Sequence, residues 1–263
     1  MLKVENIYKT FEKGTAIEKK ALKGLNLHLR EGDFVTVIGS NGAGKSTLFN
    51  AISGRFQIDS GAIHLDREDI TGLSEHKRAG KIGRLMQDPM KGTAPSLSIL
   101  ENLSLAYGRV AKGIFSGTRA EIKYFTELLE PLELGLESRL KTPVGNLSGG
   151  QRQAVTLLMC TISSPKLLLL DEHTAALDPV NAKKIIEVTE KIVERSELTT
   201  MMITHDIREA LRVGNRTIVM DDGEVILDLQ GEERKEFSLE KLMTFYKGSK
   251  GNALSDDRIL LAQ

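Results

Sequence analysis

The sequence predicts an α/β protein with a parallel central sheet, an antiparallel β segment at the start of the chain and a helical insert. Residues 25–29 alternate between leucine and polar residues, as in a strand with one buried face. Short apolar runs at 34–38 and 167–170 suit strands buried on both faces, which is typical of parallel sheets. From about residue 97 to 140, apolar residues recur at helical spacing, which predicts the insert.

The other elements follow in chain order. After the strand at 34–38, a glycine-rich segment leads into a helix that ends near Gly54. We expect one domain over 1–231, with a helical subdomain at about 88–163 inserted in its core, and a helix and tail over 232–263. The elements expected after residue 170 are a helix with Ile185, Val188, Ile192 and Val193 on one face, a strand at 199–203, a short helix ended by Gly214, a hairpin that turns at Asp222-Gly223, and a last helix at 239–246.

Composition narrows the class of protein. Lys plus Arg and Asp plus Glu each number 36, so no net charge attracts nucleic acid or anionic lipid, and we expect no nucleic-acid partner. The aliphatic run at 167–170 is far shorter than the roughly 20 apolar residues that span a bilayer. The N-terminus lacks the basic start and apolar core of a secretion signal, and the single Cys160 cannot form an internal disulfide. We expect a cytoplasmic protein that reaches a membrane only through a partner.

The first chemical motif is a phosphate-binding loop between the strand at 34–38 and the following helix. Glycines let backbone N–H groups turn toward phosphate oxygens, and the start of the helix adds its positive end. Lys45 would reach the β- and γ-phosphates, and Ser46 would ligate Mg²⁺. A flexible glycine-rich turn is the plain alternative, and kinases and GTPases share the motif. Its residues are Gly39, Ser40, Asn41, Gly42, Ala43, Gly44, Lys45, Ser46 and Thr47.

Two carboxylates end the apolar run at 167–170. In doubly wound sheets, ligands bind at the carboxyl ends of the strands. Asp171 would face Mg²⁺ through a water, and Glu172 would polarise the attacking water as a general base. The alternative is a strand that ends in ordinary solvated acids.

A second anion-binding helix start is indicated at Leu147–Gln151. Ser148 can cap the helix that runs toward residue 162, and Gly149 and Gly150 leave backbone N–H groups open to an anion. The alternative is a capped helix with no ligand.

These motifs together resemble the nucleotide-binding subunits of ABC transporters, and the resemblance covers about 1–229. It implies the ABC ATPase fold, ATP and Mg²⁺ as cofactors, and ATP hydrolysis. It also implies a second copy of the chain: Ser148, Gly149, Gly150 and Gln151 would contact the ATP held by the opposite subunit.

The resemblance assigns four further residues. Gln87 matches the glutamine that touches Mg²⁺ or the water and senses the membrane partner, and His205 matches the histidine near the γ-phosphate. Asp178 matches the loop that couples the two sites, although it could simply start the helix after it. Phe11 falls where the family stacks an aromatic ring on adenine, and a partly buried strand residue is the alternative.

The sequence at 171–179 resembles that of a bacterial importer group, with one departure. His173 stands where proline is common, and we expect a structural role for it. The importer group implies integral membrane permease subunits, an extracytoplasmic substrate-binding protein, an amino-acid cargo and a position on the inner face of the cell membrane. The segment 87–107 would form the groove for the permease.

Two rivals stay open. A soluble ABC ATPase that acts on nucleic acid or ribosomes is one, although such proteins carry paired domains or long coiled coils and this chain has one set of motifs. A nucleotide-dependent regulatory module without turnover is the other, and Glu172 and His205 argue against it.

Overall fold

A computed structural model of the chain describes residues 1–111, 118–238 and 240–241. The chain forms two compact units, Met1–Leu73 with Met201–Gln263, and Ser74–Thr200. None of the helices in these described ranges combines the length and the apolar composition that a membrane crossing requires. The expected boundary after residue 231 stays a prediction.

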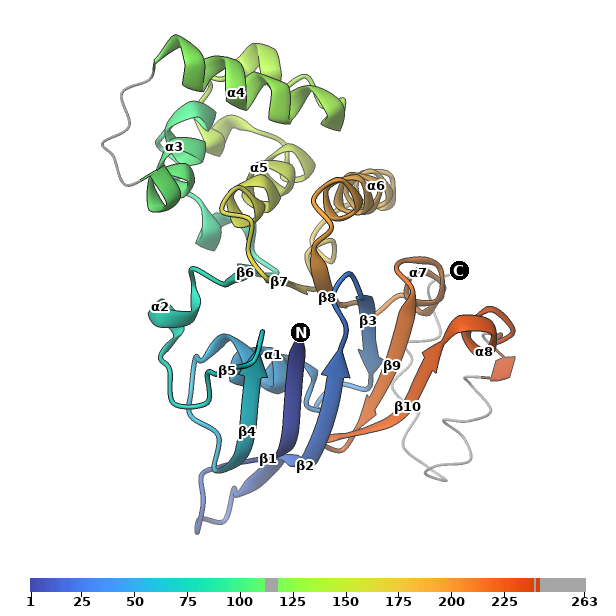
Figure 1. Cartoon of the computed structure of the whole chain (residues 1–263). Helices are drawn as coiled ribbons and strands as arrows, with labels where there is room; N and C mark the ends of the chain where they lie inside the picture. The colour runs from blue at the N-terminus through green and yellow to red at the C-terminus, as the bar shows by residue number, and fades with distance from the viewer. Residues whose placement is uncertain (112–117, 239, 242–263) are drawn as a thin grey trace. The chain divides into compact units, whose positions relative to one another are not determined.

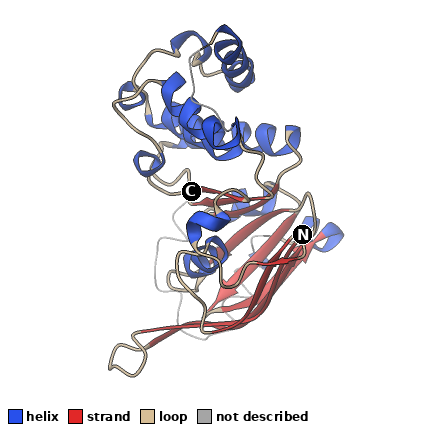
Figure 2. Ribbon diagram, turned by 60° about the vertical axis from the view of Figure 1, so that its left-hand side comes forward, coloured by secondary structure: helices blue, strands red, loops and turns tan. Residues whose placement is uncertain are grey.

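An antiparallel sheet begins the first unit (Figures 1 and 2). Its strands lie in the order β2-β1-β4-β5, and residues 25–29 at the end of β2 alternate between buried and exposed, as predicted. The strands are β1 (Leu2–Phe11), β2 (Lys19–Leu29), β4 (Ser60–Leu65) and β5 (Glu68–Asp69).

The second sheet of this unit holds β3 (Phe34–Gly39), β9 (Arg216–Asp221), β10 (Glu224–Gln230) and β8 (Thr199–Ile203), where the chain enters the unit. β3 runs parallel to β9, and its first five residues are all buried, which confirms the strand predicted at 34–38. The hairpin is also confirmed. Asp222 and Gly223 have φ of 48° and 85°, as a tight turn between β9 and β10 requires.

Three helices complete the first unit. α1 (Lys45–Ser53) ends at Gly54, whose φ of 81° is the left-handed conformation expected there. α7 (Ile207–Arg212) follows β8, as predicted. α8 (Gly231–Lys235) was not predicted, because its charged sequence has no apolar face. The helix predicted at 239–246 falls outside the described residues apart from 240–241.

The second unit pairs β6 (Ile82–Leu85) in parallel with β7 (Leu167–Asp171), and its helices include the predicted insert. The first four residues of β7 are fully buried. Pro131 ends the helical pattern in a 3₁₀ turn, as its missing N–H favours. The helical elements are α2 (Glu75–Arg78), η1 (Pro89–Gly92), α3 (Ile99–Ala111), α4 (Arg119–Leu129), η2 (Glu130–Leu132), η3 (Glu137–Arg139), η4 (Val144–Asn146), α5 (Gly149–Thr161) and α6 (Pro179–Arg195).

Candidate nucleotide-binding site

The glycine loop leaves β3 through a conformation that only glycine adopts easily. A Cβ on Gly39 would collide with the carbonyl oxygen of Met220, and one on Gly44 would lie 2.8 Å from the carbonyl oxygen of Ala21. Gly44 also has a φ of 101°. The loop is therefore packed directly against the backbone of β2 and β9. This close packing fixes the direction in which its N–H groups point.

Lys45 and the start of α1 form the part of the loop suited to a triphosphate. Lys45 is only 5% exposed, and its Nζ donates hydrogen bonds to the carbonyl oxygens of Gly39 (2.7 Å) and Ser40 (3.1 Å). Gly44 caps α1 without a side-chain acceptor, so the first-turn N–H groups face the loop with no capping side chain. Together with the positive helix end, these groups fit phosphate oxygens, and the exposed Ser46 fits a Mg²⁺ ligand.

A lysine lies beside the loop, and its cross-strand partner belongs to an aromatic pair. Phe11 ends β1, is 36% exposed, and contacts Phe56 edge to face with ring centroids 5.3 Å apart. Lys19 is the cross-strand partner of Phe11, and its Nζ lies 3.5 Å from the place a Cβ on Gly42 would take. Sequence reasoning missed Lys19, because only the register of β1 against β2 brings it to the loop. Whether Phe11 stacks on adenine stays a prediction.

The acidic strand end lies in the second unit. Asp171 closes β7 and Glu172 follows it with a φ of 48°, while Gln87 follows β6 and is exposed. Since β6 and β7 are parallel, the segments after them leave the same edge of the sheet. Arg84 on β6 places Nη2 3.5 Å from Oδ2 of Asp171, and both side chains are mostly buried. No local pattern in the sequence points to Arg84, because the pairing of two strands creates the contact.

Ser148 caps α5 as expected. Its Oγ accepts a hydrogen bond from the N–H of Gln151 (3.2 Å), and Oε1 of Gln151 accepts one from the N–H of Ser148 (3.3 Å). A hydroxyl that accepts still has its proton to donate. The cap therefore leaves Ser148 a donor for an anion. A Cβ on Gly150 would lie 3.3 Å from Oδ1 of Asn181, so this glycine lets α5 begin close to α6.

Asp178 starts α6. Its Oδ1 accepts from the N–H of Asn181 (3.1 Å) and its Oδ2 from Nδ2 of the same residue (2.6 Å). The hydrogen bonds from the Asn181 side chain and backbone lower the pKa of Asp178. The helix-start alternative is therefore what the structure shows, and the coupling role stays a prediction.

His205 belongs to the unit of the glycine loop. It lies two residues beyond β8 and is exposed, and the preceding Thr204 donates its N–H to the carbonyl oxygen of Val37 on β3 (3.3 Å). The end of β8 is thus next to the strand that feeds the loop. The loop, Phe11 and His205 belong to the first unit. Gln87, Ser148–Gln151, Asp171, Glu172 and Asp178 belong to the second.

His173 has a structural role, as expected. It is 2% exposed, and its Nε2 lies 3.1 Å from Oγ1 of Thr189 on α6. Burial lowers the pKa of His173 to about 4, because the charged imidazolium would lose its hydration. The side chain is therefore neutral and fastens the segment after Glu172 to α6.

We expect His173 to make the free energy of unfolding depend on pH. Its pKa is 6.5 when exposed and about 4 when folded, so its contribution is complete above pH 6.5 and is lost as pH falls toward 4. The shift corresponds to about 3 kcal/mol over that window. Urea unfolding at several pH values should show a shallower fall for His173→Gln than for the wild type. Equal slopes between pH 6.5 and 4 would mean that His173 is protonated in the folded chain.

The strand, glycine loop and helix with a buried lysine define the class of P-loop nucleotide-binding proteins. Residues 22–175 match the ABC transporter family model, and the chain belongs to this family. It has the ABC ATPase fold and is an ATP-binding ATPase, as the resemblance implied.

Three relatives illustrate the match. A tyrosine transport ATP-binding protein of Clostridioides difficile is 42% identical over 247 residues, which cover 92% of this chain and 97% of the relative. A xylose/arabinose import ATP-binding protein of Sulfolobus acidocaldarius is 32% identical over 96% of this chain and 97% of the relative. The dimeric structure of an ATP-binding cassette of Methanocaldococcus jannaschii in a post-hydrolysis state, bound to ADP and Pi, has a TM-score of 0.74 and 32% identity. It covers 88% of this chain and 98% of that one.

Proposed function

We propose that this ATPase powers solute import through separate integral membrane permease subunits and that the solute is an amino acid. The observation that carries the proposal is the 42% identity, over nearly the whole of both chains, to a protein named for tyrosine transport. Another relative that matches along nearly its full length is named for sugar import. An importer of this kind works with an extracytoplasmic substrate-binding protein and places its ATPase on the inner face of the cell membrane.

ATP hydrolysis depends on the motif residues described above. Lys45 and the loop amides hold the β- and γ-phosphates, and Phe11 stacks on the adenine. Ser46, Gln87 and Asp171, the last through a water, would hold Mg²⁺, and the ion would neutralise phosphate charge. Glu172 takes the proton of the attacking water, and His205 orients the γ-phosphate. The buried Lys45 and the uncapped start of α1 support this assignment.

Two copies of the chain enclose two ATP molecules. In this dimer Ser148, Gly149, Gly150 and Gln151 of one copy contact the ATP on the other, and Asp178 couples the two sites. The hydroxyl proton of Ser148, which the helix cap does not use, supports a donor role toward phosphate. A related cassette is known as a dimer with ADP and Pi.

The permease docks on the segment 87–107. Met90 is 40% exposed and Leu105 on α3 is 58% exposed, so this part of the second unit carries apolar side chains in contact with solvent. Exposed apolar side chains are suited to a protein partner. Gln87 begins the segment and transmits the state of the nucleotide to it.

Light scattering tests the two-site arrangement. Glu172→Gln with Mg·ATP should double in mass relative to the same variant without nucleotide, because bound ATP holds the copies together when it is not hydrolysed. Adding Ser148→Arg should return the mass to that of a monomer. The wild type with and without nucleotide is the reference.

A dimer that survives Ser148→Arg would contradict the contact across the two copies. A monomer in every condition, with ATP still bound, would contradict nucleotide-driven dimerisation of the chain by itself.

A further inference from the structure

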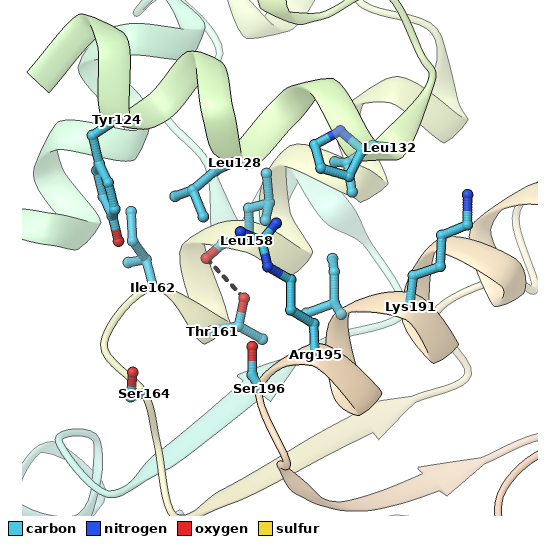
Figure 3. A pocket seen from close by; sticks show the side chains of 12 residues that line it. Tyr124, Leu128, Leu132, Leu158, Thr161, Ile162, Ser164, Lys191, Arg195 and Ser196 are labelled. Carbon is cyan, nitrogen blue, oxygen red and sulfur yellow. Dashed lines mark hydrogen bonds between the residues drawn. The ribbon is translucent and has the colours of Figure 1, made fainter.

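A cavity opens in the second unit among the last turns of α4, α5 and α6 (Figure 3). Its volume is about 150 Å³. An apolar cavity of about this size can hold one benzene ring. The aliphatic part of its lining consists of Leu128, Pro131, Leu132, Leu158, Ile162 and Ile192.

The cavity is separate from the proposed nucleotide contacts. Leu158 and Thr161 line it from the C-terminal end of α5, whereas Ser148 caps the N-terminal end. The 13 residues of α5 span about 20 Å at ~1.5 Å per residue. α6 has the same polarity, with Asp178 at its start and Arg195 at its end.

One cation at the mouth is available to a ligand. Figure 3 shows the guanidinium of Arg195 directed toward Leu158 and Leu128. Within the ranges that the structure describes, this guanidinium has no hydrogen-bond or ion-pair partner. Lys191, one turn earlier on α6, differs because its Nζ already lies 3.8 Å from a carboxylate oxygen of Glu133. Arg195 is therefore the cation that the cavity offers.

Hydroxyl groups add neutral polar atoms around the same mouth. The Tyr124 side chain lines one side, and burial raises the pKa of its phenol, which stays a protonated donor at neutral pH. Ser164 and Ser196 are exposed members of the lining. An apolar interior with a free guanidinium and hydroxyl donors at its mouth matches a ligand with an apolar body and one anionic end. A carboxylate can bind the planar fork of arginine through two hydrogen bonds.

We propose that this cavity binds a small free carboxylate with a single-ring or short branched apolar body, its carboxylate on Arg195. The inference does not depend on the import function, because none of the lining residues belongs to the proposed nucleotide site. The size of the cavity favours a free small molecule over a protein segment, which would need a longer groove.

Titrations of the full chain with benzoate, benzamide and benzylammonium test the proposal. The methyl NMR signals of leucine and isoleucine report the binding. Benzoate should give saturable shifts at Leu128, Leu158 and Ile192. Its affinity should exceed that of benzamide by about tenfold, because a hydrogen bond to a charged group contributes about 1.5 kcal/mol or more. Benzylammonium should bind most weakly.

Two variants separate the charge from the cavity. Arg195→Gln should weaken benzoate by about tenfold and leave benzamide unchanged. Leu128→Trp should fill the cavity and abolish the shifts from both probes. The matched controls are Lys183→Gln, on an exposed lysine of α6 outside the lining, and Ile122→Trp, on an exposed position of α4. Neither control should change the affinities.

Three results would overturn the proposal. Equal affinity for benzoate and benzamide would remove the anion preference. If Arg195→Gln bound benzoate as tightly as the wild type, Arg195 would not be the group that binds the carboxylate. Absence of saturable shifts at the lining methyl groups would mean that the cavity binds neither probe. Because Arg195 is exposed, its substitution leaves the fold intact, and the second of these results can be read directly.

Discussion

Glu172→Gln should lower the rate of ATP hydrolysis by about 10² to 10⁴-fold, which is the usual contribution of a positioned general base. The amide has the shape of the carboxylate but cannot accept the proton of the attacking water. ATP affinity should change little, because the phosphates are held by Lys45 and the start of α1. Phosphate release under saturating Mg·ATP measures the rate, and a fluorescent ATP analogue measures binding.

A matched control lies in the same unit. Glu197 has the same left-handed backbone as Glu172, with a φ of 48° at both residues, and it is exposed just after α6. Glu197→Gln repeats the chemical change in that backbone conformation and should leave the rate at the wild-type value. If Glu172→Gln hydrolyses ATP as fast as the wild type, the base has been assigned to the wrong residue.

Arg216→Ala should lower the free energy of unfolding by about 2 to 3 kcal/mol, since it leaves two carboxylates without their cation. Arg216 is 8% exposed and donates Nε and Nη2 to the two carboxylate oxygens of Asp228, at 2.7 and 2.5 Å. Its Nη1 donates to the carbonyl oxygen of His28 on β2 (2.6 Å) and lies 3.5 Å from Asp33. The hydrogen bonds that Arg216 donates to Asp228 raise the pKa of Arg216, so its side chain stays charged although it is buried.

Urea unfolding measures this effect, with two comparisons. Arg216→Lys keeps the charge but loses the bidentate hydrogen bonding to Asp228. Its stability should fall between those of the wild type and the alanine variant. Lys235→Ala removes an exposed lysine whose ion pair with Glu232 is on the surface, and it should change stability by less than about 0.5 kcal/mol. A loss for Lys235→Ala as large as that for Arg216→Ala would mean that burial does not set the strength of these pairs.

Many elements and motifs could be predicted because their signals are local. Alternation at 25–29, the buried runs at 34–38 and 167–170 and the Asp222-Gly223 turn each depend on residues close together in the chain, and the structure confirms them. The short helix α8 could not be predicted. It is held by Arg234, which donates hydrogen bonds to the carbonyl oxygens of residues 210, 213 and 214, far from it in sequence.

The candidate site divides in the same way. The glycine loop, the acidic strand end and the helix start at Ser148 carry their residues in consecutive positions, so the sequence alone names them. Lys19 beside the loop and Arg84 beside Asp171 depend on contacts between segments that are separate in the sequence, which no local pattern encodes.

By itself, the sequence determined that this chain is an ABC-type ATPase, because phosphate binding requires particular residues at fixed short spacings. Only the tertiary structure decided the surroundings of individual side chains, and with them their charge and their contacts. His173 is neutral because α6 buries it, Arg216 is stabilised in its buried position because two carboxylates contact it, and Arg195 faces an apolar cavity because three helices end together. Burial and long-range contact set these properties, and both arise only when distant segments pack.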